Sequence, residues 1–219
     1  MTAMTATLPH PMRVLIACEC SGVVREAFRA LGHDARSNDL KPAEDGSPHH
    51  MQCDAFDALR DWRPDLLIAH PVCRYMANSG SKHLYIGMSK ANGPNPERWE
   101  KMREATEFFR DLWDAFDGPK CFENPVMHGH AKHLIGRQQT QTIQPWMFGH
   151  PETKATCLWL HDLPRLVPTN DVRHLMQALT PAQRHRVHHM PPGPEREAER
   201  SRTYPGIAAA MADQWSPLV

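Results

Sequence analysis

The chain has 219 residues, and its 25 lysine and arginine residues balance 25 aspartate and glutamate residues, so the formal net charge is zero. This length suits one domain with a sizeable core, and the neutral charge excludes a global basic field while allowing a local basic patch. Six scattered cysteines and an opening without a secretory signal favour a reduced, cytoplasmic protein. The apolar stretches are too short to span a bilayer, so we expect no membrane partner.

The first part of the chain predicts a strand, a helix and a second strand in succession. Residues 1–12 lack periodicity, and we expect a loose tail there. The apolar run 13–18 predicts a buried strand. A helix is expected over 23–31, with Ser21 as its cap and Gly32 at its end. The second strand follows near residues 33–37.

The segment 65–70, DLLIAH, is another apolar run that predicts a buried strand. A long loop over 75–95 separates it from a helix that Asn95 would cap and Pro96 would begin. Cys73 lies just beyond the end of this strand. The sequence therefore places a thiol at a point where a strand gives way to a loop.

Three further elements complete the predicted order: strands at 120–125 and 156–160, and a helix at 207–215. This alternation predicts an α/β fold with a doubly wound, mostly parallel sheet covered on both faces. We expect a single domain over 13–219, in which the proline-, arginine- and histidine-rich stretch 164–202 is an irregular surface segment. Ligands of such sheets bind at the carboxyl ends of the strands, which is where Cys73 is expected.

The polar strand ends resemble those of the DNA cytosine-5 methyltransferases, and in particular the short, phage- and prophage-type members. The residues that carry the resemblance are Pro71-Val72-Cys73, Asn78-Ser79-Gly80, Glu123-Asn124-Pro125, Phe148-Gly149-His150-Pro151 and the closing TYPGIAAAMADQW. The resemblance covers roughly residues 12–215. It implies a Rossmann-like fold that uses S-adenosylmethionine, with cytosine in DNA as the methyl acceptor.

The resemblance gives Cys73 the role of nucleophile and Glu123, followed by Asn124, the role of the acid at ring nitrogen 3. Cytosine carbon 5 is a poor nucleophile, and a thiolate that adds to carbon 6 makes it reactive. A thiol of this kind is expected in an exposed, electropositive setting. His70 occupies the place of a family glycine, where it either lowers the pKa of the thiol or packs. The alternative for Cys73 is a buried, inert cysteine.

The donor site implied by the resemblance begins in the loop Cys18-Glu19-Cys20-Ser21-Gly22, where Glu19 departs from the glycine-rich family pattern. Asp39 is placed to bind ribose hydroxyls, and Asp54 resembles the residue that meets the adenine amino group. Pro71 belongs to the same site. The alternative for both aspartates is a turn or a helix cap.

Four residues are candidates for substrate binding: Arg74, Asn78, Ser79 and Lys154. Lys154 retains at most one cation of the family's Arg-x-Arg motif. Barely forty residues separate the strand at 156–160 from the final helix, which leaves no room for an ordinary target-recognition domain. We therefore expect DNA as the partner, with little sequence readout and with single strands among the forms that could bind.

The histidines and cysteines lack the spacing of zinc ligands, so we predict no metal site. The run RHRVHH, over 184–189, fits either a phosphate-facing patch or a solvated surface. Two alternatives to DNA methylation stay open. One is the same fold acting on a free pyrimidine nucleotide or transferring another group, and the other is a non-catalytic, methyltransferase-like protein that binds nucleic acid. The sequence leaves the oligomeric state open.

Overall fold

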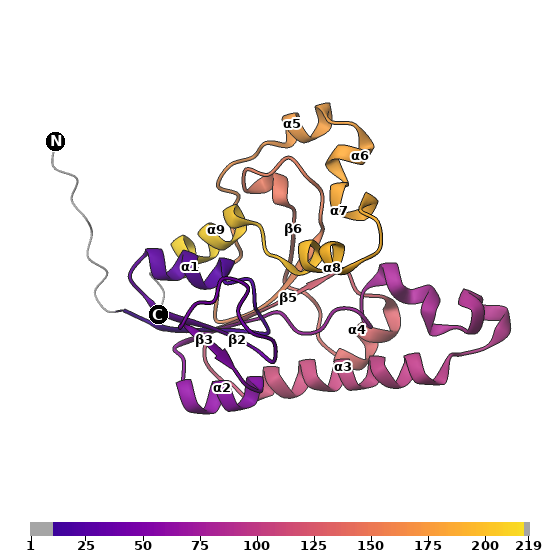
Figure 1. The fold of residues 1–219 in the computed structure, drawn as a ribbon, viewed down its shortest axis with the longest axis horizontal. Coiled ribbons are helices and arrows are strands. Elements are labelled where there is room, and N and C mark those ends of the chain that lie inside the picture. Colours follow the sequence, from indigo (N-terminus) through magenta and orange to yellow (C-terminus); the bar gives the residue numbers. More distant parts are fainter. Residues whose placement is uncertain (1–10, 217–219) are drawn as a thin grey trace.

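The computed structural model describes residues 11–216, which form a seven-stranded sheet between helices (Figure 1). The strands are β1 (Arg13–Ala17), β2 (Asp34–Asp39), β3 (His50–Gln52), β4 (Leu66–Ala69), β5 (Lys120–Pro125), β6 (Gln141–Ile143) and β7 (Thr156–His161). Their order is β3-β2-β1-β4-β5-β7-β6, and only β7 runs antiparallel to its neighbours. The predicted doubly wound, mostly parallel α/β sheet is therefore confirmed.

Helices cover both faces of the sheet. Figure 1 shows α1 (Val23–Ala30) and α9 (Pro205–Trp215) on one face, and α2 (Ala55–Trp62), α3 (Pro96–Asp114) and α4 (Gly129–Ile135) on the other. The remaining helices are short: η1 (Asn78–Leu84), η2 (Ile86–Met88), η3 (Lys90–Asn92), η4 (Pro145–Met147), α5 (Arg173–Ala178), α6 (Pro181–Arg184), α7 (Arg186–His189) and α8 (Pro194–Ser201). None of the described helices has the length and apolar composition needed to cross a bilayer.

The central strands are apolar on both faces, which is why the sequence shows continuous apolar runs there. In β1, Val14 and Ile16 belong to the core under α1 and α9. Leu15 and Ala17 point to the opposite core, under α2 and α3. All four side chains are completely buried. A strand with two buried faces cannot show the alternation of a half-exposed strand.

Several expectations change in the structure. Met12, which was assigned to the tail, is buried and donates its backbone N–H to His33 Nδ1 over 3.2 Å, whereas residues 1–10 lie outside the described part. Gly22, not Ser21, occupies the cap position of α1, although Ser21 Oγ accepts the Val23 N–H over 3.4 Å and Glu19 Oε1 accepts the Val24 N–H. Helices α2 and α4 and strand β6 were not expected.

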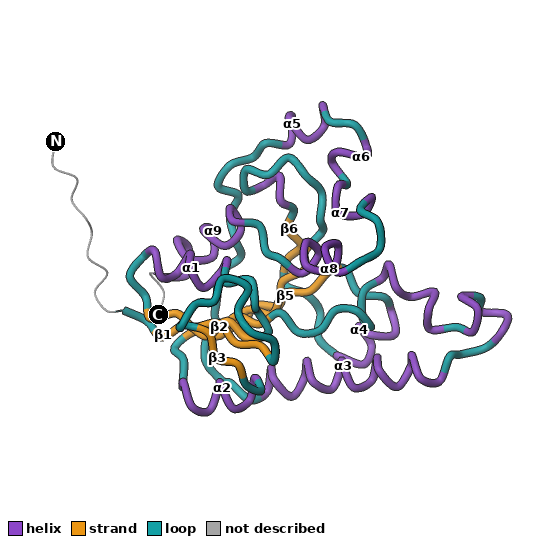
Figure 2. The backbone as a smooth tube through the Cα atoms, viewed as in Figure 1, coloured by secondary structure: helices purple, strands orange, loops and turns teal. Residues whose placement is uncertain are grey.

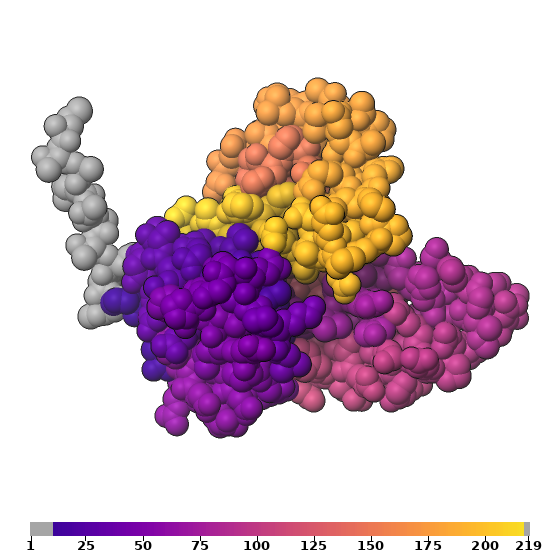
Figure 3. All heavy atoms as spheres, viewed as in Figure 1, coloured from indigo at the N-terminus to yellow at the C-terminus, as the bar shows by residue number. Residues whose placement is uncertain are grey.

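The stretch 164–202 is not irregular, because it forms the four short helices α5–α8. Pro181 and Pro194 stand in the first turns of α6 and α8, where a missing N–H costs nothing. Most side chains of these helices are exposed, which explains the weak hydrophobic periodicity. Together they rise over the sheet as one projection, visible in Figure 3 in orange and yellow.

The loop after β4 forms a second projection, which we call the arm and define as residues 74–95. Figure 2 shows that it consists of short helical turns joined by loops. Asn95 then caps α3 as predicted, since its side chain accepts the Arg98 N–H over 3.2 Å. The arm and α4 lie at the carboxyl ends of β4 and β5, on the same side of the molecule as the predicted site (Figure 1).

Candidate active site

A histidine and a glutamate meet at the carboxyl ends of β4 and β5. These strands pair in parallel with Ile68 opposite Cys121, and both residues point toward the core under α1 and α9. Two positions further along, alternation brings His70 and Glu123 to the same face. Their side chains are joined by a 2.8 Å contact between His70 Nδ1 and Glu123 Oε2, with exposed fractions of 10% and 12%.

The electrostatics of this pair favour a protonated histidine and an ionised glutamate. Burial alone would lower the pKa of His70, but the hydrogen bond and the negative charge of Glu123 raise it. Burial would raise the pKa of Glu123, yet the hydrogen bond and charge of His70 lower it. Both shifts favour the charged form of their group. The pair therefore stores one proton, on His70, next to an accepting carboxylate.

The Cys73 loop is held by backbone contacts and by one side-chain amide. Asn124 Nδ2 donates to the Pro71 carbonyl over 2.9 Å, which fixes the start of the loop. The N–H groups of Met76 and Ala77 both donate to the Cys73 carbonyl. Asn124 and Pro71 thus position the loop, and they do so from buried places.

Cys73 itself is half-buried and carries a raised pKa. Burial is the main cause, and the charge of Glu123 adds to it, while Arg200 and Lys154 act in the opposite direction. The thiol is therefore less exposed than expected, although two cations act on it, as an electropositive setting requires. The charges of Glu123 and Lys154 both act on the Cys73 thiol, so these three groups lie near one another at the ends of β4 and β5 and before β7.

Lys154 is directed toward this space from the segment before β7. Burial lowers its pKa, and the charges of Glu123 and Cys73 partly restore it. Its Nζ donates to the Arg202 carbonyl over 2.8 Å. An ammonium group in this place can shift or be displaced from a single carbonyl contact to meet another oxygen.

Helix α8 lies against the Cys73 loop. Arg200 Nη2 approaches Ser79 Oγ at 3.4 Å, and Arg74 Nη1 lies 3.8 Å from Glu197 Oε1. The exposed Asn78 donates its backbone N–H to the carbonyl oxygen of Val126. Three of the predicted substrate-binding residues therefore border the cysteine, and α8 covers part of this region.

The predicted donor loop after β1 contains a buried carboxylate. Glu19 is 6% exposed, and its Oε1 accepts from Ser21 Oγ and from the Val24 N–H, each over 3.0 Å. Its Oε2 has no partner among the described residues. Gly22 has φ 72°, and a Cβ there would lie 2.2 Å from Arg25 Nη2, so glycine is required.

The two predicted aspartates of the donor site converge on Cys18. Their charges add to burial in raising the pKa of the Cys18 thiol to about 12. Asp39 Oδ1 also accepts the Lys41 N–H, and Asp54 Oδ1 caps α2 through the Phe56 N–H. Asp39 therefore forms a turn and Asp54 forms a helix cap, each through its Oδ1 atom. The Oδ2 atom of each carboxylate takes no part in these contacts and could bind a ligand.

Sequence reasoning missed Arg200, which contacts Ser79 from the stretch assigned to an irregular surface and whose charge acts on Cys73. It also missed His128, whose Nδ1 accepts the Ala131 N–H at the start of α4 while Nε2 lies 3.1 Å from the Tyr75 carbonyl. The only available signal for Arg200 was the arginine-rich composition of 164–202. Within residues 11–216, no three His, Cys, Asp or Glu side chains gather as ligands for a metal ion.

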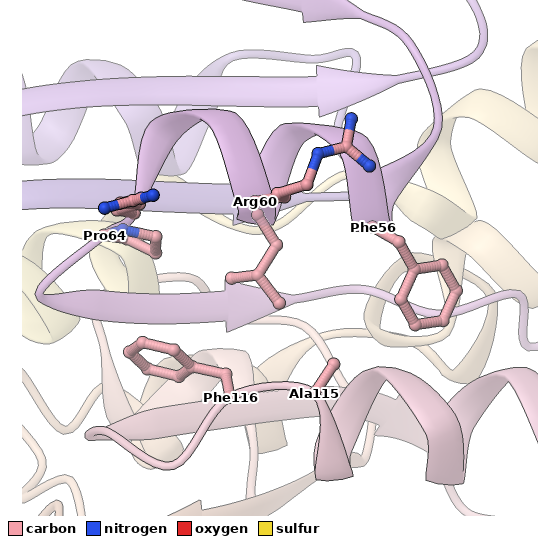
Figure 4. Close-up of a pocket in the computed structure, with 7 residues that line it drawn as sticks. Phe56, Arg60, Pro64, Ala115 and Phe116 are labelled. Carbon is pink, nitrogen blue, oxygen red and sulfur yellow. The ribbon is translucent and has the colours of Figure 1, made fainter.

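Two surface pockets are described, one beside the Cys73 loop and one at the other end of the strands. One is lined by Phe56, Arg60, Pro64, Ala115 and Phe116, and Figure 4 shows these side chains between α2 and the end of α3. Pro64 leads into the amino end of β4, so this pocket lies away from the Cys73 loop. A second pocket, between the arm and α4, includes Asn78 and adjoins the cysteine loop.

Neither a protein-family model nor a curated protein sequence matches this chain. Among solved structures, a methyltransferase from Entamoeba histolytica aligns with a TM-score of 0.45 and 14% identity. The alignment covers 74% of this chain and 58% of that protein, so this chain spans little more than half of its length. The assignment of the fold therefore relies on the strand order observed in this chain and not on that alignment.

Proposed function

We propose that the protein transfers a methyl group from S-adenosylmethionine to carbon 5 of cytosine in DNA. The observation that carries this proposal is the contact between His70 and Glu123 beside Cys73. Covalent activation of cytosine needs a thiol at carbon 6 and a proton donor at nitrogen 3. The carboxyl ends of two adjacent strands present both kinds of group.

The Cys73 thiol would give its proton to water as its sulfur forms a bond to carbon 6. The proton stored on His70 would reach nitrogen 3 through Glu123. Electrons at carbon 5 would then form the bond to the methyl carbon while the bond from that carbon to the sulfonium breaks. Water would take the carbon 5 proton as the Sγ–C6 bond breaks, and nitrogen 3 would return its proton to the His70–Glu123 pair. These steps restore the ring and release Cys73 as a thiolate, which takes a proton from water.

The residues at the ends of β1, β2 and β3 fit the charge of the donor. S-adenosylmethionine carries a sulfonium and an ammonium group, and the free Oε2 of Glu19 is a buried anionic acceptor. Asp39 would bind the ribose hydroxyls, and Asp54 would meet the adenine amino group. On the other side of the cysteine, Lys154 would contact the cytosine oxygen.

Formation of a covalent adduct tests the proposal. Oligonucleotides that contain 5-fluorocytosine, single-stranded and duplex, are incubated with S-adenosylmethionine and resolved under denaturing conditions. The fluorine cannot leave as a cation, so the protein should remain attached to the methylated base. Cys73→Ser should abolish the adduct and retain donor binding, while Cys157→Ser, buried in β7 beside Thr142, should form it normally.

One observation favours a second candidate, a non-catalytic protein that binds nucleic acid. The Cys73 thiol has a raised pKa and lies under α8, which disfavours attack in this conformation. Binding of the oligonucleotide without any adduct supports this candidate. An adduct or methylation with free fluorocytosine nucleotide alone supports a nucleotide substrate, and methylation by Cys73→Ser refutes the covalent route.

A further inference from the structure

A groove lies between the arm and α4, next to the Cys73 loop. We call it the arm groove, and its principal lining side chains are Asn78, Lys82, Tyr85, Met88, Lys90 and His130. Asn78 belongs to the same loop as Cys73, so the groove opens directly beside the candidate active site. No step of the proposed chemistry uses the other five residues.

The arm groove is basic because its walls contain no carboxylates. The sequence has 25 acidic residues among 219, yet none lies between Arg74 and Pro96 or between Asn124 and Pro151. These two acid-free segments supply both walls of the groove. The side chains of Lys82 and Lys90 are exposed, so their positive charges are available to a ligand. The groove is therefore complementary to an anion, although the whole chain is neutral.

The walls of the groove are tied together before any ligand binds. Trp99 Nε1 donates to the Leu84 carbonyl over 2.9 Å, and the Trp99 and His130 rings lie 4.8 Å apart. The Leu84 carbonyl also accepts the Asn95 N–H. Tyr85 Oη lies 3.5 Å from His130 Nε2 and links the arm to α4. A preformed groove loses less entropy when it binds a ligand.

The groove combines cations with an aromatic face. Lys90 Nζ lies 5.8 Å from the centre of the Tyr85 ring, and the Met88 side chain beside them is 56% exposed. Lysines that track phosphates, together with an aromatic ring on which a base can stack, characterise sites for unpaired nucleic acid. A lone phosphate would need the lysines but neither Tyr85 nor Met88.

We propose that the arm groove binds unpaired nucleotides next to the target base in a single-stranded polynucleotide. This inference deepens the proposed function, on which it rests for the position of the target base at Cys73. Helix α8 contacts the Cys73 loop at Arg74 and Ser79, so a duplex would have to displace it. A single strand can instead pass from the groove along Asn78 to the cysteine.

Fluorescence anisotropy with a labelled DNA single strand of about 12 nucleotides, a length within the usual range of such sites, tests the proposal. Affinity is measured over a series of salt concentrations for the intact protein, Lys82→Ala/Lys90→Ala and Tyr85→Ala. The double variant should reduce the slope of log K against log salt by about 1.4, since each lost phosphate contact on a single strand contributes about 0.7. Tyr85→Ala should weaken binding about 10-fold.

Arg60→Ala/Arg63→Ala is the matched control, because it removes two cations from the pocket between α2 and α3 (Figure 4). Its slope should equal that of the intact protein. The proposal is overturned if the lysine variant, folded by circular dichroism, keeps the intact slope, if the control changes it equally, or if a duplex binds as tightly as the single strand. Lysine-dependent binding without any adduct would support the groove and reject the proposed methyl transfer.

Discussion

At the scale of single residues, the contact between His70 and Glu123 distinguishes this site from a lone strand-end carboxylate. The charge of each partner stabilises the charged form of the other, against the effect of burial. His70 Nε2 is buried and has no partner within residues 11–216. The imidazole is therefore oriented by Glu123 alone, and the pair acts as one proton reservoir.

Replacement of His70 by asparagine should lower the rate of adduct formation by about 10²–10⁴-fold, the usual contribution of a general acid. The raised pKa of His70 means that the pair keeps its proton to a higher pH than an ordinary histidine does, and loses it as the pH rises through that pKa. The intact protein should consequently lose activity in alkaline solution, whereas His70→Asn should lack this alkaline limb. The exposed His161 provides the control, since His161→Asn should keep the intact profile. An unchanged rate and profile in His70→Asn would rule out the reservoir.

At the scale of elements, the start of α9 is clamped to the loop that precedes β7. The Gly206 N–H donates to His150 Nε2 over 3.0 Å, and a Cβ on Gly206 would lie 2.0 Å from the Phe148 carbonyl oxygen. Helix α9 forms the core with α1, so the position of this clamp determines how one face of the sheet is covered. Backbone atoms provide the contact, and they cannot move as a side chain can.

Gly206→Ala should destabilise the protein by about 1–3 kcal/mol, the usual cost of overpacking. Urea unfolding followed by circular dichroism measures this change. Gly193→Ala is the matched control, because a Cβ there meets nothing within 4 Å. Equal stabilities for the two variants would show that the loop and α9 separate more easily than their contacts indicate.

The elements also show why some predictions succeeded. Apolar runs in the sequence predicted strands β1, β4 and β5. The Asn95 cap and the proline that follows it predicted the start of helix α3. Helix α4 has only seven residues and is capped by His128, which is not among the usual capping residues. The cap of α1 comes from Glu19, outside the short window in which a cap is sought. These signals depend on contacts that neighbouring residues do not reveal.

At the scale of the whole molecule, loss of contact with solvent favours the neutral form of several histidines, of which His33 and His128 are buried, His150 is half-buried and His188 is exposed. Burial lowers the pKa of His33, His128, His150 and His188. They lie in different parts of the fold, from the start of β2 to α7. The unfolded chain binds protons at these sites near the ordinary pKa of about 6.5, whereas the folded chain resists them. Folding stability should therefore depend on pH through several small contributions.

The free energy of unfolding should fall as the pH drops below about 6.5, because the unfolded state then binds more protons than the folded state. His70 acts in the opposite sense: its contribution is present below that pH and is lost as the pH rises through its raised pKa. The lowered pKa values of the four histidines and of Glu123 all act in the first sense, so we expect the urea midpoint to decrease on acidification. His128→Asn, which retains a cap acceptor for α4, should reduce this decrease. A midpoint that stays constant or rises would contradict the expectation.

The sequence by itself determined a mostly parallel α/β sheet, the succession of its main strands along the chain and the placement of Cys73 and Glu123 at strand ends, because apolar runs and their polar ends are local patterns. Only the tertiary structure decided that His70 faces Glu123, 53 positions away, since the register of β4 against β5 brings them together. It also decided that Arg200 contacts Ser79 close enough for its charge to act on Cys73, and that burial raises the pKa of the thiol. Register, burial and long-range charge are properties of the packed molecule, and no short stretch of sequence contains them.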